Sequence, residues 1–346
     1  MKVLIIGGGF CGSMVAKRLD SRDELEVTLV DKNPYFEYYP SLPKLMTDPK
    51  YHSKIKKRYD EYLNNSDILT EKVLEITPRY VITNNRKLSF DILVISLGAR
   101  YPIYLEDKKN VFTIRSGKEV KELSKTLTKS NNILIVGGGL IGTECAAELV
   151  TKTDKDVTVI HSKERLIERN PSMASYLAEY FLKKKGAELI LNEKVTGREG
   201  HVYKTDGGRE LSADLCIWST GLSYDESIFK GFQHSIFSER GALKVNDHLQ
   251  LEGHHKIFAG GDITDIDEEK TGHNADSHSR VIAENIIRLT KGHHLKRYSK
   301  MKIPLFISLG DLNGIMSSPI ISIPGPLPAL VKYLLEKGTL LRYEFS

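Results

Sequence analysis

Cysteine is scarce in this sequence, and its spacing excludes several kinds of site. Cys11, Cys145 and Cys216 are the three cysteines among 346 residues, and none belongs to a Cys-x-x-Cys pair. Disulfide frameworks, zinc ribbons and redox dithiols need paired or clustered cysteines. We therefore expect small buried thiols, no metal site, and a reducing, cytoplasmic compartment.

Targeting signals are also missing from the start of the chain. A buried strand is expected from Lys2, which leaves no room for a signal peptide, and Lys2 stands where N-myristoylation requires glycine. The formal net charge of +5 fits a mild attraction to anionic surfaces. The sequence lacks the dense basic stripe of a nucleic-acid binder, so we expect no nucleic-acid partner.

The first residues carry a complete dinucleotide-binding fingerprint. The apolar run 2–6 predicts a buried parallel strand, glycines follow at positions 7, 9 and 12, and a second strand over 26–30 ends on Asp31. In such a unit the glycines permit a tight turn, the approach of a pyrophosphate and close packing of helix on strand. The helix N-terminus attracts phosphate, and Asp31 can accept hydrogen bonds from a ribose. The residues expected to bind this dinucleotide are Gly7, Gly9, Phe10, Cys11, Gly12, Asp31 and Lys32.

The same unit returns near the middle of the chain. The glycines at 137, 139 and 142 follow those at 7, 9 and 12 by 130 positions each, between apolar runs at 132–136 and 157–160. Two dinucleotide sites in one chain are therefore predicted. The residues expected at the second site are Gly137, Gly139, Leu140, Ile141, Gly142, Glu144, His161 and Ser162.

The second site departs from the first where its last strand ends. A shift of 130 positions from Asp31 leads to His161, so the carboxylate that would bind a 2′-hydroxyl and repel a 2′-phosphate is missing. The segment from His161 to Arg165 offers hydroxyl and cationic partners for the 2′-phosphate of NADPH, while Glu164 can still bind the ribose of NADH. The alternative interpretation is that this segment is an ordinary solvated loop without a role in binding. The choice between the two nucleotides stays open.

Further strand ends fit a fold with two such sites. Apolar runs end on Gly98-Ala99, on Gly221 and on Gly261-Asp262, and a helix is expected from Asn274 to Leu289. The remaining residues expected to bind cofactor are Val73, Gly98, Ala99, Gly221, Gly261, Asp262, Asn274 and Ala275.

These fingerprints and strand ends together resemble the two-dinucleotide-binding-domain flavoproteins, the family of disulfide reductases and NADH dehydrogenases. The resemblance covers nearly the whole chain and implies an α/β fold with two Rossmann-like, glutathione-reductase-like domains and a small C-terminal segment. It implies FAD at the first site and NADH or NADPH at the second, with Asp262 contacting the ribityl–phosphate arm of the flavin. The implied limits are 1–106 with 222–290 for FAD, 107–221 for NAD(P)H, and 291–346 for a segment that contacts the acceptor or a membrane.

Within this family the chain is most similar to type II NADH:quinone oxidoreductases and to ferroptosis-suppressor (apoptosis-inducing-factor-homologous) flavoproteins. His161-Ser162 and the stretch from Tyr298 to Gly314 resemble the suppressor branch. Residues 272–277, Gly-His-Asn-Ala-Asp-Ser, depart from the quinone-side Ala-Gln-x-Ala-x-Gln motif of the dehydrogenases, and the lipid-attachment glycine of the vertebrate suppressor is missing. Residues 33–43 contain no cysteine, which argues against dithiol chemistry.

Glu144 and His273 are the predicted catalytic residues. Glu144 is expected in the first turn of the helix after Gly142, where the resemblance implies that it reaches the contact between flavin and nicotinamide. An acid favoured there by the helix dipole is the alternative. His273 or His278 can donate a proton to a reduced acceptor, with a solvated or structural histidine as the alternative. The N-terminus of the expected helix 274–289 should direct its positive dipole end at the flavin pyrimidine.

The C-terminal tail contains a long uncharged stretch. Residues 312–331 carry no charge, but four prolines in them exclude a membrane-spanning helix. The stretch can cover the flavin as loops, dip into a membrane surface beside Lys332 and Lys337, or form a homodimer contact. The lysine clusters 54–58 and 183–185 are interpreted as solvated faces of helices.

The predicted function is that of an FAD-dependent NAD(P)H:quinone oxidoreductase, with a quinone or another small molecule as electron acceptor. Hydride passes from nicotinamide to flavin when the two rings stack. The expected location is the cytoplasm, including the cytoplasmic face of a membrane. A ferredoxin- or rubredoxin-type reductase is the second alternative, and a redox-sensing binding protein without turnover is the third.

Overall fold

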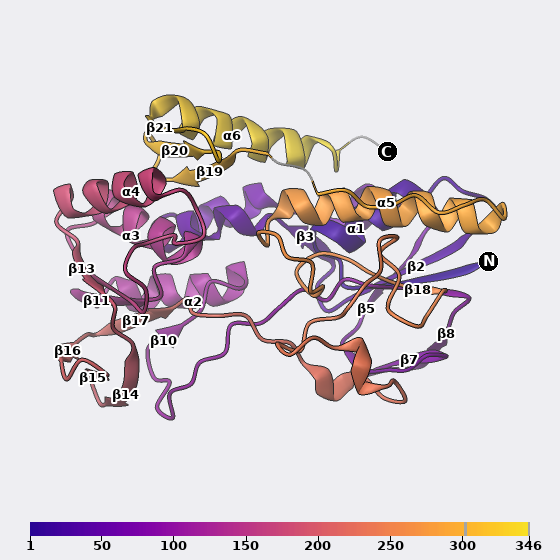
Figure 1. The fold of residues 1–346 in the computed structure, drawn as a ribbon, viewed down its shortest axis with the longest axis horizontal. Helices are drawn as coiled ribbons and strands as arrows, with labels where there is room; N and C mark the ends of the chain where they lie inside the picture. Colours follow the sequence, from indigo (N-terminus) through magenta and orange to yellow (C-terminus); the bar gives the residue numbers. More distant parts are fainter. Residues whose placement is uncertain (301–302, 345–346) are drawn as a thin grey trace.

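Two parallel sheets of five strands each lie at the centre of the molecule (Figure 1). The computed structural model describes residues 1–300 and 303–344. The central strands are short runs of valine, isoleucine and leucine with almost no exposed surface. This is the pattern of parallel strands that helices cover on both faces. The α/β fold class predicted from the sequence is confirmed.

The first sheet takes its strands from separate parts of the chain. In order across the sheet they are β18 (Ile257–Ala259), β9 (Ile92–Ile95), β1 (Lys2–Ile6), β2 (Glu26–Asp31) and β5 (Asp67–Thr70). The helices α1 (Phe10–Leu19) and α5 (Gly272–Thr290) pack against each other beside this sheet. Helix α5 starts slightly earlier and ends slightly later than the predicted range 274–289.

The second sheet repeats the plan of the first. Its order is β10 (Val111–Phe112), β17 (Leu215–Trp218), β11 (Asn132–Val136), β12 (Asp156–His161) and β13 (Glu188–Leu191). The helices of this part are α2 (Gly117–Leu127), α3 (Leu140–Lys152) and α4 (Ser172–Lys184).

The internal repeat extends to the strand register. Lys2 pairs with Glu26 in the first sheet, and Asn132 pairs with Asp156 in the second, so both partners shift by 130 positions. The glycine after each first strand donates its N–H to the carbonyl of the penultimate residue of the neighbouring strand, Val30 or Ile160, at 2.8 Å in both units. The two units are therefore equivalent in backbone geometry as well as in sequence. The domain limits inferred from the resemblance stay predictions.

Smaller elements surround the two sheets. One antiparallel sheet contains β6 (Val73–Ile76), β7 (Tyr80–Thr83) and β8 (Lys87–Ser89), and another contains β14 (Val195–Glu199), β15 (Val202–Thr205) and β16 (Glu210–Ser212). A two-stranded sheet pairs β3 (Tyr35–Glu37) with β4 (Lys56–Arg58). Short 3₁₀ helices are η1 (Tyr39–Met46), η2 (Pro49–Ile55), η3 (Tyr59–Glu61), η4 (Glu226–Ile228) and η5 (His234–Ile236).

The interpretation of residues 54–58 as a helix face was wrong for residues 56–58, whereas Lys54 and Ile55 do end the 3₁₀ helix η2. Residues 56–58 form β4, because they pair with β3, and the Lys56 ammonium lies 4.5 Å from the centre of the Tyr35 ring. The other lysine cluster, 183–185, does lie at the end of a helix, α4.

The C-terminal unit covers one side of the molecule (Figure 1). It consists of an antiparallel sheet of β19 (Leu305–Ser308), β20 (Gly314–Ser317) and β21 (Ser322–Gly325), followed by α6 (Pro326–Leu341). Pro326 and Pro328 lie in the first turn of α6, where a missing N–H costs no hydrogen bond. No helix within the described residues has the length and apolar character needed to span a bilayer. In the predicted segment 291–346, residues 301–302 and 345–346 lie outside the described part.

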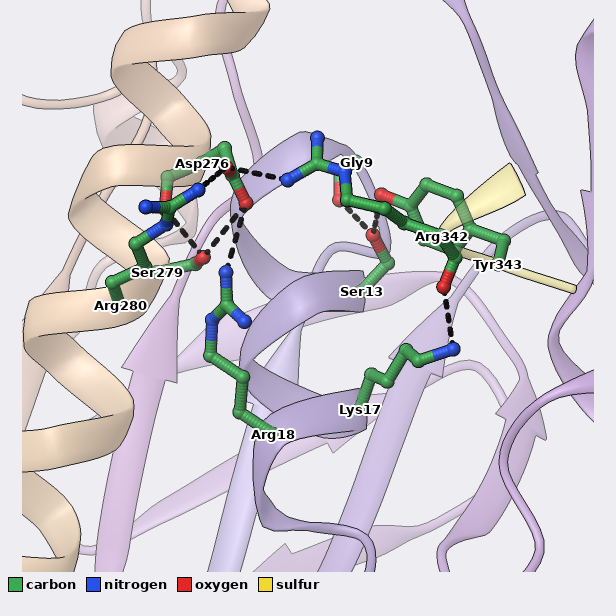
Figure 2. A network of polar contacts seen from close by, with 9 residues as sticks. All are labelled: Gly9, Ser13, Lys17, Arg18, Asp276, Ser279, Arg280, Arg342 and Tyr343. Carbon is green, nitrogen blue, oxygen red and sulfur yellow. Dashed lines mark hydrogen bonds and ion pairs between the residues drawn. The ribbon is translucent and has the colours of Figure 1, made fainter. Parts of the chain in front are cut away.

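The end of α6 docks on α1 and α5 (Figure 2). Asp276 on α5 is 3% exposed and binds three guanidinium groups, those of Arg342 at 2.8 Å and of Arg18 and Arg280 at 3.2 Å each. The hydroxyl of Tyr343 lies 3.0 Å from that of Ser13. The C-terminal unit is therefore attached to the first sheet and its helices by buried polar contacts.

Candidate functional site

A cavity of about 1350 Å³ opens between the two sheets and the C-terminal unit. Carboxyl ends of parallel strands meet at one edge of a sheet, which is where such folds bind ligands. The predicted site residues in the cavity wall are Gly7, Gly9, Phe10, Cys11, Asp31, Lys32, Val73, Gly98, Ala99, Leu140, Ile141, Glu144, Gly261, Asp262, His273, Asn274 and Ala275. The predicted residues that do not line it are Gly12, Gly137, Gly139, Gly142, His161, Ser162 and Gly221.

The first fingerprint has the geometry of a phosphate-binding turn. Gly7 has a φ of +94°, and a Cβ on Gly12 would lie 1.9 Å from the carbonyl oxygen of Gly7, so both positions need glycine for the fold. A Cβ on Gly9 would meet no protein atom within 4 Å. No side chain caps α1. The first-turn N–H groups and the space over Gly9 are thus available to a phosphate.

Two backbone N–H groups hold the side chain of Asp31 in place. Its carboxylate accepts the N–H of Gly8 at 2.6 Å and the N–H of Asn33 at 2.7 Å. Burial raises its pKa above the ordinary aspartate value, and the two backbone N–H groups oppose that shift. One end of the cavity therefore carries the acid that the dinucleotide fingerprint requires.

Asp262 is a half-buried carboxylate in the cavity wall. No hydrogen bond or ion pair to it exists within residues 1–300 and 303–344. Burial raises its pKa, and the cation of Lys270 partly counters this. An ionised carboxylate only accepts hydrogen bonds, so an unpartnered one in a cavity wall fits a ligand that carries hydroxyl or N–H donors. FAD, with a polyhydroxyl arm next to its phosphates, matches this requirement.

The two histidines near α5 have different surroundings. His273 is exposed in the cavity wall, where partial burial lowers the pKa of its imidazole below the ordinary value. His278 is 1% exposed and accepts the N–H of Gly261 on Nδ1 at 2.9 Å, with Glu268 2.9 Å from Nε2. His278 thus positions the Gly261 turn, which agrees with the alternative prediction of a structural histidine. His273, by contrast, lies in the cavity wall.

The second fingerprint repeats the geometry of the first. Gly137 has a φ of +108°, and a Cβ on Gly142 would lie 1.8 Å from the carbonyl oxygen of Gly137. A Cβ on Gly139 would again meet nothing within 4 Å, and no side chain caps α3. A second phosphate can therefore approach α3 as the first approaches α1.

Glu144 lies in the cavity wall, where it has two partners from the C-terminal unit. Its Oε1 accepts the N–H of Ser308 at 2.9 Å and forms an ion pair with Lys332. The side chains of Glu144 and Lys332 are 10% and 18% exposed. The predicted place of Glu144 in the first turn was wrong, because α3 begins at Leu140 and its first turn contains no acidic residue.

Lys332 is a site residue that the sequence did not indicate. The residue was interpreted as flanking a membrane-contacting stretch, and its ammonium instead contacts Glu144 across 188 positions of sequence. Other missed wall residues include charged groups such as Arg115 and Arg342. A third set is apolar or aromatic and comes from three segments: Tyr38, Tyr39, Pro43, Leu305, Phe306, Val331 and Leu335. They make one side of the cavity suited to a flat apolar molecule.

The three cysteines offer no reactive thiol. Cys11, Cys145 and Cys216 are all free and buried. Burial raises the pKa of each thiol, to about 12 for Cys216. Thiolate is the nucleophilic form, so these groups are inert at neutral pH.

Comparisons with known proteins agree with this geometry. A family model described as "Pyridine nucleotide-disulphide oxidoreductase" matches residues 1–283. Apoptosis-inducing factor homolog B of Dictyostelium discoideum is 32% identical over 91% of this chain and 88% of its own length. Ferroptosis suppressor protein 1 of Taeniopygia guttata is 30% identical over the same shares.

Solved structures share the fold over almost the whole chain. The NDH2 of Plasmodium falciparum in complex with NADH superposes with a TM-score of 0.89 and 15% identity, covering 99% of this chain and 96% of that one. The sulfide:quinone oxidoreductase of Aquifex aeolicus superposes with a TM-score of 0.86 and 21% identity, covering 99% and 91%.

Proposed function

The chain belongs to the pyridine nucleotide-disulphide oxidoreductase family, and on that premise we propose that it is a flavin-dependent NAD(P)H:quinone oxidoreductase. One observation carries the proposal. A single cavity takes its walls from both dinucleotide-binding units and from an apolar C-terminal unit. A nicotinamide ring, a flavin ring and a flat acceptor can therefore meet in one place.

The first unit supplies the residues that fit FAD. Gly9 and the N-terminus of α1 bind the pyrophosphate. Asp31 accepts hydrogen bonds from the adenosine ribose, and Asp262 accepts hydrogen bonds from hydroxyls of the ribityl arm. When bound, FAD takes up hydride and releases electrons singly or in pairs. The N-terminus of α5 borders the cavity at residues 271–275, so its positive dipole end stabilises negative charge that develops there.

The ion pair between Glu144 and Lys332 acts at the nicotinamide end of the cavity. Leu140, Ile141 and Glu144 lie next to each other at the start of α3, where the second dinucleotide reaches the first unit. Lys332 holds the Glu144 carboxylate in position, and the carboxylate then accepts a hydrogen bond from the carboxamide N–H. This interaction orients one face of the nicotinamide ring for hydride transfer.

The acceptor side combines apolar walls with one titratable group. Phe306 and Leu335 provide contact surface for a quinone ring, and His273 lies at the same opening. With a lowered pKa, His273 is neutral at pH 7 and can exchange protons as the acceptor is reduced. These features favour a quinone over an iron–sulfur protein, which would dock on a charged surface.

The C-terminal unit offers a surface that suits a membrane. Ile320 is 96% exposed in the turn before β21, and Leu327, Leu330 and Leu334 on α6 are 54–64% exposed. Contiguous exposed apolar side chains mark membrane or partner contacts. We propose that this face rests on the cytoplasmic side of a bilayer, from which a lipid-soluble quinone reaches the cavity.

Anaerobic stopped-flow spectroscopy tests the proposed reaction. The purified protein is mixed with NADH or NADPH and then with a short-chain quinone, while the flavin absorbance is followed. Bleaching followed by recovery with quinone is the expected result. Bleaching that only an iron–sulfur protein reverses would establish the reductase alternative, and bleaching without turnover by either acceptor would favour a redox sensor.

Liposome flotation tests the membrane face. Leu330→Gln with Leu334→Gln should reduce flotation at least about fivefold, since each change removes about 2 kcal/mol of apolar transfer energy. The matched control is Leu312→Gln, which is 78% exposed and lies outside α6. A wild-type protein that stays in the soluble fraction and forms dimers would instead assign this face to a homodimer contact.

A further inference from the structure

The second dinucleotide unit carries a histidine where the first carries its ribose-binding acid. In the first unit the N–H of Gly8 donates to Asp31 at 2.6 Å. In the second unit Gly138 is the equivalent of Gly8, and a Cβ on Gly138 would lie 2.9 Å from Cγ of His161. The imidazole of His161 therefore fills the space beside the glycine turn that the carboxylate would occupy.

The loop that follows His161 places another carboxylate, that of Glu168, next to the end of this strand. Oε2 of Glu168 lies 3.2 Å from Nε2 of His161, and Glu168 also lines the cavity. By contrast, Glu164, the acid that the sequence suggested for NADH, is exposed, and its side chain makes no hydrogen bond or ion pair within the described residues.

The backbone of the loop is held in a strained form that presents Glu168. Ile167 has a φ of +45°, a left-handed conformation that a β-branched residue rarely adopts. Its N–H donates to the carbonyl of Gly138 at 2.8 Å, so the loop is tied to the glycine turn itself. Strain of this kind persists where the surrounding structure fixes it, and it is concentrated at binding sites.

Arg165 fixes the same loop from the inside. Its guanidinium donates to the carbonyls of Asn170 and Glu168 at 2.8 and 2.6 Å and to the hydroxyl of Ser175 at 2.6 Å. An arginine near this strand end is the group that would bind the 2′-phosphate of NADPH. Here its two terminal nitrogens donate within the protein and fix the conformation of the loop.

We propose that Glu168 replaces the missing acid of the second unit and makes the protein prefer NADH to NADPH. The inference rests on the proposed function in one respect, that the second unit binds a nicotinamide dinucleotide. A carboxylate accepts hydrogen bonds from the 2′-hydroxyl of NADH and repels a 2′-phosphate. Lys163 and Arg169 are exposed cations on the same loop, whereas Glu168 contacts His161, the residue at the strand end, directly.

Binding of redox-inert fragments tests this assignment. ADP-ribose and 2′-phospho-ADP-ribose are titrated calorimetrically into the oxidised holoprotein, so that neither hydride transfer nor an acceptor is involved. The wild type should bind ADP-ribose at least about tenfold more tightly than 2′-phospho-ADP-ribose, because one hydrogen bond to a charged group has an effect of this size. Glu168→Gln should lower this preference at least about fivefold.

A charge-matched control separates contact from long-range electrostatics. Glu164→Gln removes the same unit charge from the same loop and should leave the preference within about twofold of wild type. Equal effects of the two substitutions, or a wild type that binds 2′-phospho-ADP-ribose as tightly as ADP-ribose, would overturn the assignment. Because quinone turnover is not part of this measurement, a shifted preference without quinone reduction would uphold Glu168 and reject the proposed acceptor.

Discussion

A methyl group on Gly139 is expected to weaken nucleotide binding strongly without disturbing the fold. Gly139 is the N-cap of α3, with φ −70° and ψ −170°, values that alanine adopts freely. A Cβ there would meet no protein atom within 4 Å. Nothing in the protein therefore requires glycine at this position, and the open space above it is free for a ligand that approaches the backbone closely.

The size of each effect follows from these distances. Alanine is a poorer N-cap than glycine but loses less chain entropy on folding, so Gly139→Ala should change the free energy of unfolding by less than about 0.5 kcal/mol. The affinity for a dinucleotide should fall by about 10- to 100-fold, because the methyl group displaces the pyrophosphate from charge-assisted N–H contacts worth about 1.5–3 kcal/mol.

Gly142→Ala is the matched contrast on the same helix. Its Cβ would lie 1.8 Å from the carbonyl oxygen of Gly137, whereas contacts below 3.0 Å do not occur in real structures. The helix and the strand would have to separate, at a cost of about 3 kcal/mol for overpacking against rigid backbone. Loss of stability should therefore accompany any loss of binding in Gly142→Ala, but not in Gly139→Ala.

Circular dichroism during urea unfolding, the flavin absorbance and ADP-ribose titration together provide the assay. Gly139→Ala should keep wild-type stability and flavin content and lose ADP-ribose binding. Gly9→Ala should do the reverse, losing flavin and keeping ADP-ribose binding, because it is the equivalent position of the first unit. Normal ADP-ribose binding by Gly139→Ala would refute the argument, since the pyrophosphate could then not pass over this glycine.

Other contacts lead to shorter predictions. Lys332→Met should slow flavin reduction by NADH about 10- to 100-fold at unchanged flavin content, measured by stopped flow, because Glu144 loses the cation that orients it. Asp276→Asn should lower the free energy of unfolding by about 3 kcal/mol, as three arginines lose their buried partner. Those arginines lower the pKa of Asp276 in the folded protein. The contribution of Asp276 to the free energy of unfolding is therefore complete above the pKa of an unfolded aspartate, and it is lost as the pH falls through the lower pKa of the folded state. The acid unfolding of Asp276→Asn should accordingly depend less on pH below about 4. A thiol reagent should leave Cys145 unmodified in the native protein and label it after unfolding in urea, since burial raises its pKa.

Local patterns in the sequence predicted most of the fold. The two glycine fingerprints and the strand ends at Gly98 and Asp262 depend on neighbours close in the chain, and the cavity forms where these ends meet. The shift of 130 positions holds for glycines, for strand register and for the turn hydrogen bonds, because the two units satisfy the same steric constraints twice. The predicted start of α5 was close for the same reason.

Contacts between distant segments could not be predicted in this way. The partner of Glu144 lies 188 positions away, and two of the three arginines around Asp276, Arg18 and Arg342, come from α1 and from the chain end. Glu168 is near His161 in sequence, but an unusual backbone conformation at Ile167 brings the two side chains together. Periodicity carries no information about either kind of contact.

The C-terminal helix explains how an apolar acceptor site can be built on two nucleotide-binding units. Lys332 binds Glu144 of the second unit, while buried Glu336, four residues later, accepts a hydrogen bond from Tyr51 of the first unit at 2.5 Å. One turn of α6 therefore bridges both units at the cavity wall, and its opposite face stays exposed and apolar. Because charged contacts fix the inner face, the outer face is free to contact a membrane without altering the geometry in which nicotinamide, flavin and acceptor would meet.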